Sequence, residues 1–220
     1  MPIVERLKTI INEYHLLKHP FYQAWSAGTL SQTTLQKYAV EYYFQVESFP
    51  RFISRVHSHC PLIDVRKALL ANLVDEEIHG TDHPTLWRQF AKGIGASIDE
   101  VKHEPAEYET QALVDTFYDL ADRDWRDGLC ALFAYEYQVP SVSESKIAGL
   151  KQFYGISDEK TLEFFTAHQV YDVEHSDQVA NLIERYANSQ QAEKATHEAA
   201  FSLWKFLDGM SRVNECVAAH

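Results

Sequence analysis

Three side chains in one short stretch have the types and the spacing of metal ligands. Within Phe164–Asp177, His168, Asp172 and His175 stand at positions i, i+4 and i+7. At about 100° per residue these positions form one stripe of an α-helix, roughly 10 Å long, which is sufficient for two ions. Imidazole nitrogen and carboxylate oxygen both suit iron, manganese and zinc. The alternative is a solvated helix face, because His and Asp are ordinary surface residues.

A second group of potential ligands lies upstream, in the stretch from Asp75 to His83. Glu76 with His79, at i and i+3, would reproduce the Glu-x-x-His pair of ferritin-like di-iron bundles. Glu76 with His83 would be some 10 Å apart on an ideal helix, but Gly80 can unwind the helix and let His83 swing inward. We prefer Glu76 with His83, because the other ligand-bearing stretch lacks the second Glu-x-x-His pair of a ferritin-like bundle.

A third candidate, Glu136, stands in an otherwise apolar and aromatic segment, residues 131–139. A carboxylate buried without a partner is costly, so something positive should face it. The segment holds no Lys or Arg. A metal is therefore the simplest partner, although a polar edge or a hydrogen bond to a tyrosine would also satisfy the carboxylate. The full candidate set can hold two divalent cations, whose open positions activate O2; it comprises Glu76, His83, Glu136, His168, Asp172 and His175.

The elements that must position these residues all show helical spacing of apolar side chains. Only eight Gly and seven Pro punctuate the 220 residues, and no alternating strand pattern stands out. We expect Pro50 to kink or divide the third helix, and residues 93–105 to form a loop. The predicted class is all-α, a bundle of seven or more helices in a single domain over residues 1–220. The expected helices cover residues 3–17, 21–28, 31–60, 64–79, 84–91, 108–120, 125–139, 141–154, 158–188 and 191–213.

Composition argues against several classes of function. The net charge is -12, with 32 acidic and 20 basic residues and no Lys/Arg cluster, so a nucleic-acid partner would be repelled. The three cysteines are few and far apart, which predicts neither a disulfide framework nor a cysteine-based zinc site. No apolar run approaches the ~20 residues that span a bilayer, and the first residues lack a signal-peptide pattern. We therefore expect a soluble, cytoplasmic protein without a membrane partner.

The ligand pattern resembles that of the haem-oxygenase-like di-metal oxidases. It consists of Glu followed by His seven residues on, a distant single Glu, and His-x-x-x-Asp-x-x-His. The group named for the Chlamydia protein associating with death domains, whose members make the folate precursor para-aminobenzoate, is the most similar. The resemblance extends from His19-Pro-Phe-Tyr-Gln-Ala-Trp25 to the last expected helix. The wider superfamily includes thiaminase II and the pyrroloquinoline quinone synthesis protein C, which share the fold without this metal set. No Cys lies in the ligand-bearing stretches, which argues against a thiaminase.

In that group the protein is thought to be its own substrate, with one tyrosine side chain excised as the aromatic ring and a lysine donating the amino group. The resemblance implies Tyr22 as the tyrosine, Lys146 as the lysine, and Tyr135, beside Glu136, as a candidate radical relay. A phenol is readily oxidised, and a desolvated lysine is nucleophilic. Without the resemblance, Tyr22 would be one of 12 tyrosines and Lys146 a solvated helix residue.

The leading expectation is an oxygen-dependent, self-sacrificing para-aminobenzoate synthase with a di-iron or iron-manganese site. Its co-substrates would be O2 and a reductant, and a homodimer is a candidate assembly. One alternative is an oxidase that uses the same metals on an external small molecule. Another is a non-catalytic interaction module. Metal content separates enzyme from module, and the fate of Tyr22 separates the two enzymes.

Overall fold

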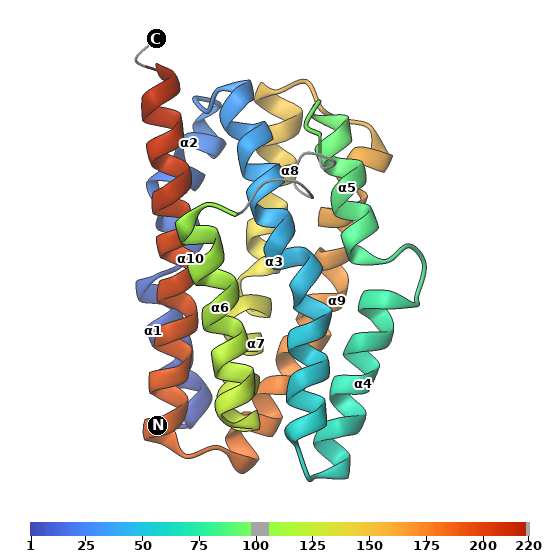
Figure 1. Ribbon diagram of the computed structural model, residues 1–220, viewed down its shortest axis with the longest axis vertical. Coiled ribbons are helices and arrows are strands. Elements are labelled where there is room, and N and C mark those ends of the chain that lie inside the picture. Colours follow the sequence, from blue (N-terminus) through green and yellow to red (C-terminus); the bar gives the residue numbers. More distant parts are fainter. Residues whose placement is uncertain (98–105, 219–220) are drawn as a thin grey trace.

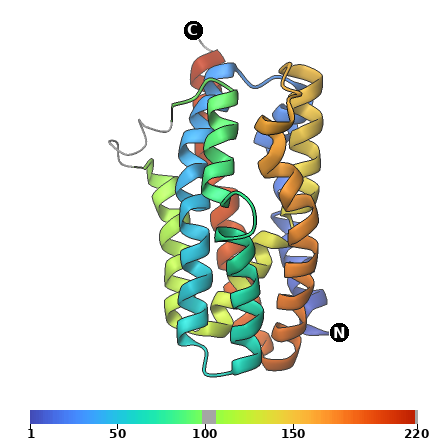
Figure 2. The same ribbon diagram turned by 90° about the vertical axis from the view of Figure 1, so that its right-hand side faces the viewer.

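The computed structural model describes residues 1–97 and 106–218, and all regular secondary structure within these residues is helical. In two views at right angles, most helices run along the long axis of the molecule (Figures 1 and 2). The expectation of an all-α bundle is therefore confirmed. The elements are α1 (Ile3–Glu13), a 3-10 helix η1 (Leu16–Lys18), α2 (Pro20–Ala27), α3 (Gln32–His59), α4 (Ile63–Glu77), α5 (His83–Gly93), α6 (Tyr108–Arg123), α7 (Trp125–Glu136), α8 (Val139–Phe153), α9 (Glu159–Tyr186) and α10 (Ser189–Ala218).

The break between α4 and α5 positions two of the predicted ligands. The expected helix to His79 ends two residues early, at Glu77, and a loop over Ile78–Asp82 joins it to α5. This loop projects from the molecule where α5 continues the direction of α4 (Figure 1). Gly80 adopts φ 76°, a left-handed conformation that favours glycine. The predicted unwinding at Gly80 is thus confirmed, and His83 becomes the first residue of the next helix.

Prolines interrupt the helices less than their positions suggest. Pro50 lies inside α3, which is continuous over its 28 residues, so the predicted division does not occur. Pro140 lies in the first turn of α8, where its missing N–H breaks no helical hydrogen bond. Glu136 ends α7 just before this junction. The loop expected over residues 93–105 lies partly outside the described residues, and α5 ends at its first residue, Gly93.

Side-chain caps and close packing fix the two helices that carry most of the predicted ligands. Asp82 caps α5 by accepting from the Thr85 N–H at 2.8 Å, and Asp158 caps α9 by accepting from the Thr161 N–H at 2.9 Å. Gly93 faces the Thr161 side chain so closely that a Cβ at position 93 would overlap it. Helix α9 also packs against α7 and α8. Among the described residues, no helix is long and apolar enough to cross a membrane.

Candidate metal centre

All six predicted ligands point into the interior. They come from four helices: α4, α5, α7 and α9. None is more than 5 % exposed, which removes the solvated-face alternative for the stripe on α9. The residues are Glu76, His83, Glu136, His168, Asp172 and His175.

Three of the six lie within the reach of one metal ion. One ligand atom from each of Glu76, His83 and His168 lies within 4.8 Å of the other two. His83 Nδ1 is 2.8 Å from Glu76 Oε2, and the rings of His83 and His168 have centroids 4.3 Å apart. His168 Nδ1 lies 2.7 Å from the Phe164 carbonyl oxygen, to which it donates, so Nε2 is the nitrogen with a lone pair to offer.

The remaining carboxylates supply acceptor oxygens without matching donors. Glu136 Oε1 accepts from Asn72 Nδ2 at 2.6 Å. Within the described residues, neither Glu136 Oε2 nor Asp172 Oδ2, both buried, has a hydrogen-bond partner. Burial raises the pKa of Glu136 to about 8, and burial followed by the charges of Glu136 and Glu76 raises the pKa of Asp172 well above its usual range. Buried acceptors in excess over donors fit a site for cations.

The two adjacent imidazoles have opposite tendencies to bind a proton. Burial alone would lower the pKa of His83, but the Glu76 carboxylate together with the charges of Asp75 and Asp82 outweighs burial, and the net shift is upward. Burial, followed by the charge of His83, lowers the pKa of His168 well below its usual range. His168 is therefore a neutral imidazole, the form that binds a metal.

His175 and His79 share one carboxylate. His175 Nε2 lies 2.9 Å from Asp75 Oδ2, and His79 Nδ1 lies 2.6 Å from Asp75 Oδ1. The His79 side chain is 63 % exposed. His79 is not part of the group formed by Glu76, His83 and His168. The geometry therefore favours the pairing of Glu76 with His83 over the ferritin-like pairing of Glu76 with His79.

A second buried cluster surrounds Lys146 on α8. Lys146 Nζ donates to Tyr38 Oη at 2.8 Å, and Tyr22 Oη lies 2.9 Å from the same Tyr38 oxygen. Burial lowers the pKa of Lys146 to about 7, which leaves much of the amine neutral near pH 7. Five ring centroids lie 5.1–5.5 Å from Nζ, and their faces favour the ammonium and so oppose this shift; the rings are those of Tyr22, Tyr38, Tyr42, Trp87 and Phe165.

Tyrosine contacts connect the Lys146 cluster to the predicted ligands. The rings of Tyr38 and Tyr42 stack with centroids 5.4 Å apart, and Tyr42 Oη donates to Tyr135 Oη at 3.1 Å. Tyr135 directly precedes Glu136. Burial raises the pKa of Tyr22 and of Tyr135 well above the usual range, so both phenols stay protonated.

Sequence reasoning missed four residues in these clusters, namely Tyr38, Tyr42, Asn72 and Asp75. Signals for them existed. Tyr38 and Tyr42 stand one turn apart in an aromatic-rich helix, and Asn72 stands one turn before Glu76. A weaker signal existed for the burial of Lys146, which stands one turn from both Val142 and Leu150 on the apolar face of its helix, although the polar Ser-Glu-Ser precedes it.

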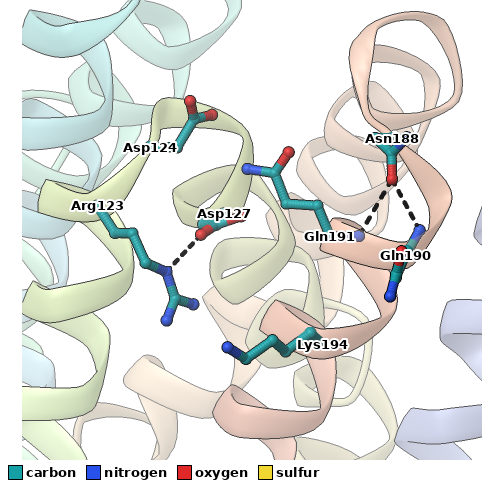
Figure 3. Close-up of a pocket in the computed structure, with 7 residues that line it drawn as sticks. All are labelled: Arg123, Asp124, Asp127, Asn188, Gln190, Gln191 and Lys194. Carbon is teal, nitrogen blue, oxygen red and sulfur yellow. Dashed lines mark hydrogen bonds and ion pairs between the residues drawn. The ribbon is translucent and has the colours of Figure 1, made fainter.

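A surface pocket elsewhere has a different character. It has a volume of about 540 Å³ and lies where the α6–α7 and α9–α10 junctions meet (Figure 3). Arg123 Nε pairs with Asp127 Oδ2 at 2.5 Å, and Asn188 caps the start of α10 through the Gln190 and Gln191 N–H groups (Figure 3). Its acidic and basic side chains all take part in ion pairs, with each other or with the neighbouring Arg126 and Glu198, so positive charge already faces its carboxylates.

The fold matches a known class of helical proteins. A solved TenA homolog from Pseudomonas syringae pv. tomato aligns with a TM-score of 0.82, covering 96% of this chain and 91% of that chain at 14% identity. This likeness concerns the fold alone, and it agrees with the expected haem-oxygenase-like bundle.

The sequence defines the family more narrowly. Residues 36–209 match the family described as iron-containing redox enzymes, and the chain belongs to this family.

A relative from Nitrosomonas europaea is 40% identical over 94% of this chain and 89% of its own length. Another, from Chlamydia muridarum, is 38% identical over 100% of this chain and 94% of its own length. Both relatives are named 4-aminobenzoate synthase. The resemblance seen in the sequence is thereby confirmed, and the family together with the Glu76–His83–His168 cluster supports metal binding.

Proposed function

We propose that this chain is an oxygen-dependent di-metal oxidase that forms para-aminobenzoate from its own Tyr22 side chain, with the amino group from Lys146. The names of the relatives support the product. One observation supports the choice of these two residues. Tyr22 and Lys146 both bond to the phenol oxygen of Tyr38 inside the protein. Tyr22 is 2 % exposed and Lys146 is 3 % exposed, so both groups react away from water.

The chemistry of the product constrains the bonds that change. Para-aminobenzoate carries one carbon opposite its amino group, and the tyrosine side chain carries one carbon, Cβ, opposite its hydroxyl group. Cβ of Tyr22 therefore becomes the carboxyl carbon, and its bond to Cα breaks. The Lys146 nitrogen bonds to the ring carbon in place of the phenol oxygen, which leaves as water. The Nζ–Cε bond of Lys146 then breaks, so that the amino group departs with the product. Conversion of a methylene to a carboxyl group is an oxidation, for which O2 is the oxidant and an external reductant balances the remaining electrons.

The six buried ligands would hold two metal ions, either Fe/Fe or Fe/Mn. When bound, the ions supply activation of O2. The chain's own groups prepare the reactants. Burial keeps much of Lys146 neutral and nucleophilic, while Tyr38 accepts its N–H and holds Nζ beside Tyr22. We assign Tyr135 as the relay, because its contact with Tyr42 leads towards Tyr38 and Tyr22.

The test is a single exposure of the reduced, metal-loaded protein to O2, followed by peptide mass analysis. The peptide that contains Tyr22 should become lighter by about the tyrosyl side chain, and product should not exceed one molecule per chain. Tyr22→Phe should bind metal normally and form no product, because phenylalanine keeps the ring but lacks the oxidisable phenol. Tyr43→Phe is the matched control, since the Tyr43 hydroxyl bonds to Glu47 and not to Tyr38 or Lys146. Catalytic product from the Tyr22→Phe protein would point instead to an external substrate.

We also infer that residues 1–220 form a single domain. The N–H groups of Ile3 and Val4 donate to the Glu184 carboxylate at 3.0 and 2.9 Å, which ties the start of the chain to α9. Helix α1 also packs against α10. Limited proteolysis should then leave no stable fragment shorter than this core, and two stable fragments would indicate two domains.

A further inference from the structure

The last turns of α4 contact a predicted ligand on each of three other helices. Glu76 meets His83 on α5, as described above. Two residues that are not predicted ligands make the other contacts: Asn72 binds Glu136 of α7, and Asp75 binds His175 of α9. One short segment of α4 therefore touches ligands from every other helix that supplies them.

Asn72 determines which oxygen of Glu136 remains for a metal. Its side chain is 3 % exposed, and Nδ2 donates to Oε1 at 2.6 Å. Oε2 is the buried oxygen that has no hydrogen-bond partner among the described residues. Since Asn72 is neutral, it orients the carboxylate without cancelling its charge, and the charge stays available to a cation.

Asp75 determines the orientation of the His175 ring. Its Oδ2 accepts from Nε2 at 2.9 Å, and this bond places the ring proton on Nε2. His175 would then coordinate a metal through Nδ1. The second oxygen of Asp75 binds His79, so the carboxylate itself is held from both sides. A carboxylate behind a histidine ligand is a recurrent means of fixing the tautomer and raising the basicity of the ring.

We infer that Asn72 and Asp75 are positioning residues of the metal centre, which act through Glu136 and His175. The inference rests on the metal site of the proposed function, and it assigns α4 the role of aligning ligands from α7 and α9. Substitution of such supporting residues typically weakens metal binding about 10–100-fold. The two contacts are independent, so either substitution alone should have this effect.

The test measures the dissociation constant for Mn²⁺ by competition with a chelator under argon. We expect Asp75→Ala and Asn72→Leu each to weaken binding about 10–100-fold. Asp75→Asn should recover most of the loss, because its amide oxygen still accepts from Nε2. Loading with Co²⁺ adds a readout, since the visible absorption of the ion reports ligand geometry and should change in Asp75→Ala. Leu70→Ala, which alters an exposed residue of the same helix α4, is the control.

Two results would overturn the positioning role while leaving the proposed function intact. One is wild-type Mn²⁺ affinity in Asp75→Ala and Asn72→Leu. The other is an equal loss in Asp75→Ala and Asp75→Asn with a matching fall in the melting temperature of the metal-free protein, which would indicate general structural damage. A wild-type chain that binds no Mn²⁺ and no iron would overturn both the positioning role and the proposed function.

Discussion

The molecule contains two buried polar clusters, one rich in carboxylates and one built around an amine. The ligand cluster gathers three carboxylates and three imidazoles, and at least two of its carboxylate oxygens have no donor among the described residues. The Lys146 cluster gathers one amine and several phenols, and its Nζ has a hydrogen-bond acceptor in Tyr38 and ring faces on several sides. The first cluster has buried acceptor oxygens that a cation would satisfy. The second already pairs its amine with an acceptor from the chain.

This difference shows how one protein interior can tune two kinds of reactivity. Burial raises the pKa of Glu136 and lowers the pKa of Lys146, and in both groups it disfavours the charged form. A cation can restore the charge of the carboxylates, whereas among the described residues only the ring faces favour the charged form of the Lys146 amine. The proposed function uses this difference, with the carboxylates as metal ligands and the lysine as a nucleophile.

The largest effect should come from removing a ligand from the first cluster. Asp172→Ala should weaken Mn²⁺ binding by at least roughly 100-fold, more than the loss expected from a supporting residue, and should abolish product. The Lys146 cluster should stay intact, because Asp172 makes none of its hydrogen bonds. Elemental analysis and chelator competition measure the loss, with the exposed neighbour Glu174→Ala as control. Full metal content in Asp172→Ala would remove this residue from the ligand set.

The second prediction concerns the pH dependence that Lys146 gives to stability. Because burial lowers its pKa to about 7, the native state binds this proton less readily than the unfolded chain, whose lysine titrates near 10.4. The destabilising effect is complete below about pH 7 and disappears as pH rises towards 10.4. Lys146→Met should therefore raise the free energy of unfolding at pH 7 by about 1–4 kcal/mol, and by little near pH 10.4.

Urea unfolding at several pH values tests this second prediction, with the exposed Lys151→Met as the control. A gain in stability that stays constant from pH 6 to pH 10.4 would show that better packing, not loss of a buried charge, explains it. Lys146→Met should change metal affinity far less than Asp172→Ala does, since the hydrogen bond of Lys146 goes to Tyr38 and only its charge reaches His168.

A smaller effect should appear in the loop over Ile78–Asp82. Metal bound by Glu76 and His83 would join the end of α4 to the start of α5 and so restrain this loop. Removal of metal should raise amide hydrogen exchange there several-fold while leaving α6, which supplies none of the predicted ligands, unchanged. Equal protection in both states would argue that His83 is not a ligand.

The smallest effect should follow from His79→Ala. The ring is exposed, and among the described residues its one hydrogen bond goes to Asp75 Oδ1, so metal affinity should change less than about two-fold. The same chelator competition measures it. A loss as large as that of Asp172→Ala would favour the ferritin-like pairing of Glu76 with His79.

The sequence predicted the helices and the ligands for one physical reason. Residues on one helix face recur at a period near 3.6, so both the apolar stripes and the His168–Asp172–His175 series are visible in a single segment. Gly80 revealed the break before His83, because its freedom at positive φ is a local property. The end of α4 was placed two residues late, since nothing local distinguishes Ile78 and His79 from helical residues.

The supporting contacts could not be predicted in this way. Asn72 meets Glu136 across 64 positions of the chain, and Lys146 meets Tyr38 across 108. Such pairs depend on how helices pack, and periodicity within one helix carries no information about its neighbour. Only the resemblance to a family indicated Tyr22 and Lys146, and in the structure both side chains bond to the phenol oxygen of Tyr38.

The burial of Tyr22 gives the proposed reaction a consequence for the lifetime of the chain. Its ring fills a closed part of the core, where it contacts Phe21 and Trp25. Loss of an aromatic side chain from a core typically costs about 3–5 kcal/mol, a large share of the ~5–15 kcal/mol that holds a domain folded. A chain that has reacted would therefore unfold more often and be degraded sooner than an unreacted one. Each chain would be consumed as a reagent and not reused as a catalyst. The amount of product would then be limited by the rate at which new chains are synthesised.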